Sequence, residues 1–267
     1  MNRFVTDKGM HVRHIHRKNT RGSLVFVHGL GESGLCAEPL GHAMNSGDLL
    51  KDWDLWIPDL PGYGCSLHRS PPLSLVAQAG CIREIIENVQ PSPVVIMGHS
   101  MGGVIGQIIS EMHDVSLTGF INIEGNLTAG DCVFSGQAAS VPLSEFVATG
   151  FDRLKSCVFE NGIRFPAQRG YYASMRFANP EQFHQNSREL LEYSSPGTAA
   201  ERFAALQFPT LYIAGQPHGI CPESLRQLAQ HAVTPAIIQD AGHWPFLDQP
   251  GTFYRIITRF LSTISLP

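Results

Sequence analysis

The sequence predicts an α/β fold in which helices flank a mostly parallel sheet of eight strands. Short, continuously apolar segments alternate with segments of helical spacing, and such strands are typical of a sheet buried on both faces. Residues 126–205 interrupt this alternation because they contain no clear strand. A loop of that length without secondary structure is uncommon in a compact domain. We therefore expect a helical lid there, inserted between the sixth and seventh strands.

The predicted elements follow one another in a regular order along the chain. A hairpin is expected first, with strands in 2–7 and 11–17 on either side of Lys8–Gly9. Further strands are expected at 23–27, 55–58, 93–97, 117–123, 210–214 and 236–239, and helices at 73–89 (ending before Pro91), 104–112, 222–232 and 252–261. The lid divides the chain, so that residues 1–125 and 206–267 form the core and residues 126–205 form the cap.

Composition and charge exclude several classes of protein. The 19 Lys and Arg residues against 23 Asp and Glu residues leave a net charge of −4, whereas a general nucleic-acid binder needs a positive field. No stretch of 18 apolar residues is present, so we expect no membrane span. The N-terminus lacks the apolar segment of a secretory signal, and we expect a cytoplasmic protein that acts on a small molecule.

The cysteines and histidines do not have the spacing of a metal site. The six cysteines are widely separated and include no Cys-x-x-Cys pair, so we expect free, mostly buried thiols. The 12 histidines include no His-Glu-x-x-His pattern. His11, His14 and His16 are expected on a strand rather than around an ion. We therefore expect neither a metal nor a cofactor.

The segment Val94–Gly103 contains the pattern Gly-x-Ser-x-Gly, with Ser100 as its serine. The pattern alone is weak, but here it follows an apolar strand and opens a helix, as a nucleophile elbow requires. A strained turn of this kind pushes the serine Oγ above the sheet, and the two glycines relieve the crowding. The helix N-terminus places backbone N–H groups beside a developing oxyanion. The alternative interpretation is an ordinary tight turn.

Four segments in a fixed order resemble those of the α/β-hydrolase superfamily, and the resemblance runs nearly from end to end. They are His28–Gly31 after the third strand, Asp59–Ser66 after the fourth, the turn at Ser100, and Gly242–His243 after the last strand. The resemblance implies the α/β-hydrolase fold, with Ser100 as nucleophile and His243 as its base. It also implies an oxyanion hole formed by the N–H groups of Leu30 and Met101, and a structural role for His28.

The acid of the triad departs from the commonest pattern of the superfamily. The position after the seventh strand where most relatives have an aspartate is His218 here. Our candidate is Glu124, which ends the sixth strand, the place used by a branch of the haloalkane dehalogenases. A carboxylate that ends an apolar strand is costly unless it is paired, and His243 would pair with it. The alternatives are Glu223, Asp240 and Asp131, while Asp59 and Asp248 are expected to be structural.

These residues predict a serine hydrolase that cleaves a carboxylic ester through an acyl-enzyme on Ser100. A serine at that position excludes the alkyl-enzyme mechanism of dehalogenases and epoxide hydrolases, which needs an aspartate. The aromatic residues of the lid favour an apolar substrate. Acyl transfer, or cleavage of a thioester or lactone, would use the same residues. A third hypothesis is a ligand receptor on the same fold, with vestigial turnover.

Overall fold

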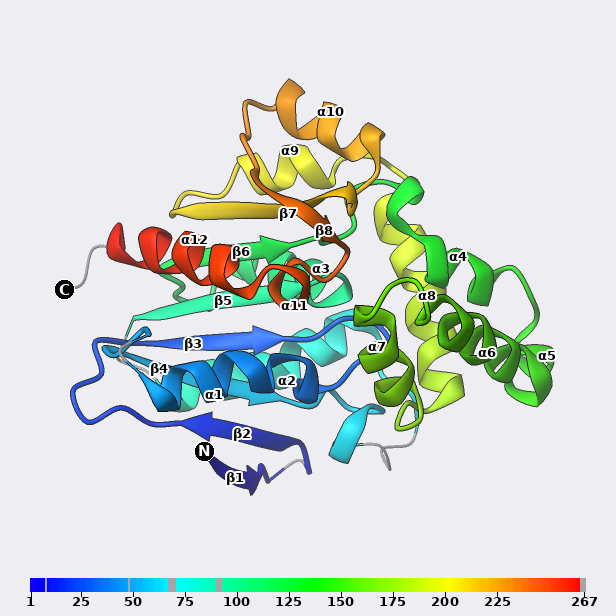
Figure 1. Ribbon diagram of the computed structural model, residues 1–267, viewed down its shortest axis with the longest axis horizontal. Coiled ribbons are helices and arrows are strands. Elements are labelled where there is room, and N and C mark those ends of the chain that lie inside the picture. The colour runs from blue at the N-terminus through cyan, green and yellow to red at the C-terminus, as the bar shows by residue number, and fades with distance from the viewer. Residues whose placement is uncertain (8, 48, 67–70, 90–92, 265–267) are drawn as a thin grey trace.

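The computed structural model describes residues 1–7, 9–47, 49–66, 71–89 and 93–264, and Figure 1 shows its ribbon; Lys8 and Pro91 lie outside these ranges. Eight strands form one sheet in the order β1-β2-β4-β3-β5-β6-β7-β8. They are β1 Asn2–Val5, β2 His11–Ile15, β3 Gly22–Val27, β4 Trp53–Pro58, β5 Val94–His99, β6 Gly119–Ile123, β7 Thr210–His218 and β8 Ala236–Gly242. The β1–β2 and β2–β4 pairs are antiparallel, and the other five pairs are parallel. The predicted fold class is therefore confirmed.

Helices cover both faces of this sheet. They are α1 Glu38–Ser46, α2 Leu75–Val89, α3 Met101–Ser110, α10 Pro222–Gln230, α11 Pro245–Asp248 and α12 Pro250–Ser262. In Figure 1, α1 and α12 lie in front of the sheet, and α2 and α3 lie behind it. Every residue of β3, β5 and β6 is consequently buried. This explains why these strands are apolar throughout instead of alternating with polar residues.

The helices that flank the sheet differ in places from the sequence prediction. Helix α3 begins at Met101, three residues before the predicted start, because Gly102 and Gly103 form its first turn without contributing to the apolar spacing. Helix α1 was not predicted. It carries only a narrow apolar stripe, made by the buried Leu40 and Met44 at i, i+4 spacing.

The segment between β6 and β7 is helical, and its described residues contain no strand. Its helices are the 3₁₀-helix Ala129–Asp131, α4 Val133–Ala139, α5 Leu143–Glu145, the π-helix Phe146–Gly150, α6 Phe151–Asn161, α7 Ala167–Met175, α8 Pro180–Ser194 and α9 Ala199–Ala204. Helices α4 to α8 lie beyond the end of the sheet to which the arrowheads of β3 and β6 point (Figure 1). Helix α9 instead packs on the sheet, because Phe203 contacts Phe120 and Tyr212. The division of the chain into core and cap stays a prediction.

The six cysteines form no disulfide in the described chain, but they are not mostly buried. Cys81 and Cys132 are buried, while Cys65 and Cys157 are exposed and the remaining two are half-buried. The prediction of burial was wrong for Cys65, in the short 3₁₀-helix Gly64–Ser66, and for Cys157, on the outer face of α6, because their spacing in the sequence does not show which side of a helix faces solvent.

None of the helices in the described part of the chain combines the length and apolar character that crossing a membrane requires.

A buried ion pair joins the antiparallel edge of the sheet to the loop that follows β4. Arg13 of β2 donates to Asp59 Oδ1 over 2.6 Å, and the two side chains are 2% and 0% exposed. The N–H groups of Gly34 and Cys65 also donate to Asp59. Burial alone would raise the pKa of Asp59, but the Arg13 charge and these hydrogen bonds lower it.

Replacing Arg13 with Ala should destabilise the protein strongly, because the buried Asp59 would keep its charge without the cation that balances it. Loss of one member of a buried pair costs about 3–5 kcal/mol, which denaturant unfolding would measure. The matched control is Arg153→Ala, which removes a surface pair with Glu145 and should cost about 1 kcal/mol or less. Equal losses for the two variants would contradict the structural role of the buried pair.

Candidate active site

Ser100 stands at a strained turn between β5 and α3. Its φ of 52° and ψ of −118° lie outside the conformations that a non-glycine residue ordinarily adopts. A Cβ added at Gly102 would lie 2.0 Å from the carbonyl oxygen of Val27, and one at Gly98 would lie 2.2 Å from the Gly102 carbonyl oxygen. Both positions therefore require glycine, because α3 packs closely against the end of β3. The structure has the geometry that the Gly-x-Ser-x-Gly pattern predicts.

His243 and Glu124 are brought together from the ends of two different strands. Glu124 follows β6 with a φ of 54°, and His243 follows β8. The His243 Nδ1 atom lies 3.3 Å from Glu124 Oε2, while Glu124 Oε1 accepts a 2.6 Å hydrogen bond from the N–H of Gly215. Burial raises the pKa of Glu124, and the hydrogen bonds from His243 and Gly215 oppose this rise. The sequence-predicted acid and base are thus adjacent.

The alternative acids have other partners. Asp131 accepts hydrogen bonds from the N–H groups of Leu127 and Cys221 and from the Ser224 hydroxyl, and so joins the segment after β6 to α10.

Glu223 is exposed in the first turn of α10 and pairs with Arg226. His218, where most relatives have their acid, is exposed and packs against the Phe165 ring. Asp240 is exposed at a positive φ. Of the four acids considered, Glu124 is the one that contacts His243 in the described part of the chain.

Two backbone N–H groups beside Ser100 have no hydrogen-bond partner among the described residues. They belong to Leu30, after the Gly29 turn, and to Met101, the first residue of α3. The Gly29 backbone approaches Ser100 closely, since a Cβ added at Gly29 would lie 3.1 Å from Ser100 Cβ. Both groups are therefore available to an oxygen atom bound there.

Ser100 and His243 line one cavity of about 30 Å³, together with Leu30, Phe134 and Tyr171. The Ser100 side chain forms no hydrogen bond with a described residue, and such catalytic contacts are often loose before substrate binds.

A second cavity, of about 680 Å³, adjoins the first at Phe134, His243 and Trp244. Helix α7 and the end of β7 provide much of its wall, and no Lys or Arg lines either cavity in the described chain.

His28 braces the loop after β3, as expected. Its Nε2 atom accepts a hydrogen bond from the N–H of Leu60, and its Nδ1 atom faces the carbonyl of Gly29. The ring is completely buried and has no contact with Ser100 that would suit a second base.

Sequence reasoning missed two residues of the site, Glu32 and His99. The Glu32 carboxylate accepts hydrogen bonds from the N–H of Gly29 over 2.6 Å, from His99 Nδ1 over 2.8 Å and from Trp244 Nε1 over 2.5 Å. His99 Nε2 lies 2.7 Å from the His243 carbonyl oxygen. A signal was present, since Glu32 is an acid within an otherwise small and apolar segment, Gly29–Gly34, next to a predicted strand.

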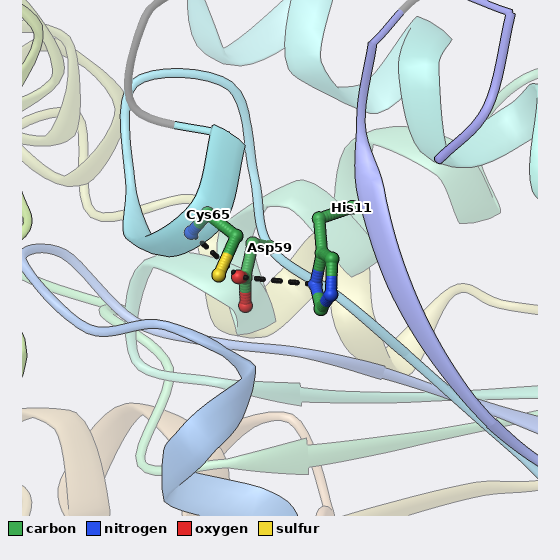
Figure 2. A group of neighbouring side chains, drawn as sticks. All are labelled: His11, Asp59 and Cys65. Atoms are coloured by element: carbon green, nitrogen blue, oxygen red, sulfur yellow. Dashed lines mark hydrogen bonds and ion pairs between the residues drawn. The ribbon is translucent and has the colours of Figure 1, made fainter. Parts of the chain in front are cut away.

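Two groups of side chains have the composition of metal ligands. In one, His11, Asp59 and Cys65 lie close together (Figure 2). Both oxygens of Asp59 are already engaged by Arg13 and by backbone N–H groups, and the Arg13 charge opposes a cation.

In the other group, His14 and His16 both contact Asp54 Oδ2, over 3.2 and 3.0 Å. The two histidines and Asp54 thus satisfy one another by hydrogen bonds, with no need for an ion. Both groups lie on β2, β4 and the loop after β4, away from the residues around Ser100.

Comparison with known proteins places this geometry in a family. The sequence profile described as "Alpha/beta hydrolase family" matches residues 24–256. A pimeloyl-[acyl-carrier protein] methyl ester esterase of Serratia marcescens is 23% identical, and the match covers 90% of this chain and 93% of that protein. A thermophilic esterase of Thermogutta terrifontis superimposes with a TM-score of 0.78 at 19% identity, covering 99% of each chain. The N-acyl homoserine lactonase AidH, complexed with N-butanoyl homoserine, gives a TM-score of 0.76 at 18% identity, over 99% of this chain and 98% of that one.

Proposed function

The chain belongs to the alpha/beta hydrolase family, and we propose that it is a serine hydrolase that cleaves a carboxylic ester of a small, apolar substrate. The observation that carries the proposal is the strained serine at the N-terminus of α3, which shares a cavity with a histidine held by a buried carboxylate. The names of the relatives support ester hydrolysis, since two of the three are esterases and the third opens a lactone, a cyclic ester.

In the proposed mechanism, Ser100 Oγ attacks the acyl carbon and His243 takes its proton. Nδ1 of His243 faces Glu124, so Nε2 is the atom left to act as base. The same nitrogen then protonates the leaving alcohol as the ester bond breaks. A water molecule, deprotonated by His243, attacks the acyl-enzyme and releases the acid.

Glu124 is the proposed acid because it keeps the imidazole in the required tautomer and stabilises its positive charge during the reaction. Two hydrogen bonds fix the position of Glu124. Its carboxylate accepts one from the N–H of Gly215, and its own N–H donates the other to the carbonyl oxygen of Ile213 in β7. A Cβ at Gly219 would lie 2.3 Å from Glu124 Oε1, so the loop after β7 encloses the carboxylate. In this position Glu124 takes the place of the aspartate that the loop itself lacks.

The proposed oxyanion hole consists of the N–H groups of Leu30 and Met101. Both are free of partners in the described chain, and the positive end of the α3 dipole lies beside Met101. Donors that are held in place before the reaction stabilise the tetrahedral intermediate without a cost of reorganisation.

The cavities favour an uncharged ester over a thioester of a phosphorylated carrier. The larger cavity is lined by apolar side chains such as Phe134, Phe165 and Ile220, and its charged groups are carboxylates, including Asp240 and Asp248. No Lys or Arg on these walls would pair with phosphate groups. Thioesterase and acyltransferase activities on coenzyme A substrates are therefore the weaker alternatives.

Replacing Ser100 with Ala should abolish hydrolysis of p-nitrophenyl esters, because no acyl-enzyme would form. A fluorophosphonate probe should label the wild-type protein on Ser100 and leave the variant unlabelled. An idle receptor would label slowly or not at all. Wild-type rates in the variant would contradict the proposal.

Replacing Glu124 with Gln should lower kcat by roughly 10⁴-fold with folding intact, by comparison with triad acids elsewhere. Circular dichroism would check folding. Glu223→Gln is the matched control, since Glu223 is exposed and should leave kcat unchanged. If Glu223→Gln were the crippling change, the assignment of the acid would be wrong.

The protein should hydrolyse an uncharged ester with a higher kcat/KM than the coenzyme A thioester of the same acid. The physical reason is the acidic, Lys- and Arg-free lining of the larger cavity, which repels phosphate. The measurement is kcat/KM for acetyl and butyryl substrates of both kinds at low and high salt. Preference for the thioester would refute this part of the proposal.

A further inference from the structure

Glu32 and His99 form a buried contact directly behind the proposed catalytic groups. Their side chains are 2% and 1% exposed, and the His99 Nδ1 and Glu32 Oε2 atoms are 2.8 Å apart. His99 precedes Ser100 in the chain, and Glu32 lies two residues after Leu30. The contact therefore links the nucleophile turn to the loop that carries a proposed oxyanion donor.

The hydrogen bonds of His99 indicate that both ring nitrogens carry a proton. Nδ1 faces the Glu32 carboxylate, and Nε2 faces the His243 carbonyl oxygen over 2.7 Å. A carbonyl oxygen only accepts, so Nε2 must donate. The carboxylate already accepts from the N–H of Gly29 and from the Trp244 indole, a pattern that favours its ionised form. With both nitrogens donating, His99 is an imidazolium.

The surrounding charges agree with this assignment. Burial would raise the pKa of Glu32, but His99, Trp244 and the Gly29 N–H lower it to about 2. Burial would lower the pKa of His99, but Glu32 and the hydrogen bond to His243 raise it. The other titratable groups that face the pair are His28, Cys36, Glu124, Tyr171 and His243. Of these, Glu124 also favours the charged form of His99.

We propose that Glu32 and His99 are a permanently charged buried pair whose role is to position the general base and the oxyanion loop. The inference rests on the proposed function of Ser100 and His243. His99 binds the backbone carbonyl of His243. Glu32 binds the indole of the next residue, Trp244. Glu32 holds Gly29 at the same time, so one carboxylate sets the distance between base and oxyanion hole. Neither side chain takes up or releases a proton in the reaction.

The first test measures the protons themselves and does not depend on enzyme activity. In protein labelled with ¹⁵N at histidine, His99 should show two ring N–H groups from pH 6 to 8, both in the wild type and in Ser100→Ala. The His99 signals are identified by their absence from His99→Asn. A neutral His99 with one ring proton at pH 7 would overturn the proposal, whatever the outcome for hydrolysis.

The second test separates positioning from folding. Glu32→Gln should lower kcat on the order of 10²-fold with little change in KM, because the base and the oxyanion donors move relative to one another. Its activity relative to wild type should fall further as pH rises, since His99 without its counter-ion loses a proton. Cys36→Ala is the matched control. Its thiol lies 3.8 Å from Glu32 Oε2 and carries no charge, so the ratio to wild type should be flat across pH.

A double variant covers the case in which Glu32→Gln folds poorly. Glu32→Gln with His99→Asn removes both charges, so stability should recover relative to the single variant, because no unpaired buried charge is left. The kcat defect should remain. If the double variant recovered kcat together with stability, the pair would be a stabilising contact and no more, and the proposal would be wrong.

The pH dependence of stability provides a final readout with a definite sign. Glu32 has a lowered pKa, so its contribution is present above 4.5 and is lost as pH falls toward 2. His99 has a raised pKa, so its contribution is present below 6.5 and is lost as pH rises through its folded value. The stability difference between wild type and Glu32→Gln should therefore be widest between pH 4.5 and 6.5. A difference independent of pH would contradict the charged pair.

Discussion

Three N–H donors from three different segments converge on the carboxylate of Glu32. They come from the loop after β3, from the end of β5 and from the loop after β8. Without an acceptor at this point, the N–H of Gly29, Nδ1 of His99 and the indole N–H of Trp244 would be buried and unsatisfied. Each such group costs about 1–3 kcal/mol. The arrangement of the loops after β3 and β8 beside Ser100 depends on this one side chain.

The sheet explains why so many polar groups can meet at one end of it. Parallel strands bring their carboxyl ends to the same edge, and here that edge presents Ser100 after β5, Glu124 after β6 and His243 after β8. Two of the three, Ser100 and Glu124, have positive φ angles. Strain of this kind persists only where the surrounding packing requires it, and here the helices on both faces and the loop after β7 supply that packing.

The proposed acid, Glu124, comes from a different strand than the acid of most members of the superfamily. The loop after β7 offers the exposed His218, yet Glu124 reaches Nδ1 of His243 from the neighbouring strand. Because β6 and β7 are adjacent in the sheet, a carboxylate at the end of either strand arrives at nearly the same place. The hydrogen bond from the N–H of Gly215 to Glu124 joins β7 to the proposed acid.

The sequence by itself determined the sheet, the order of its strands along the chain and the turn at Ser100, because these depend on local apolar runs and on glycines at fixed spacing. It also offered Glu124 and His243 as candidate acid and base, since each follows a predicted strand and the resemblance to the superfamily implies a base near the C-terminus. It could not find the convergence on Glu32, nor the packing of α9 on the sheet, nor the exposure of Cys65. Those features depend on contacts between residues far apart in the chain, such as Glu32 and Trp244. Only the tertiary structure decides which buried donor meets which acceptor.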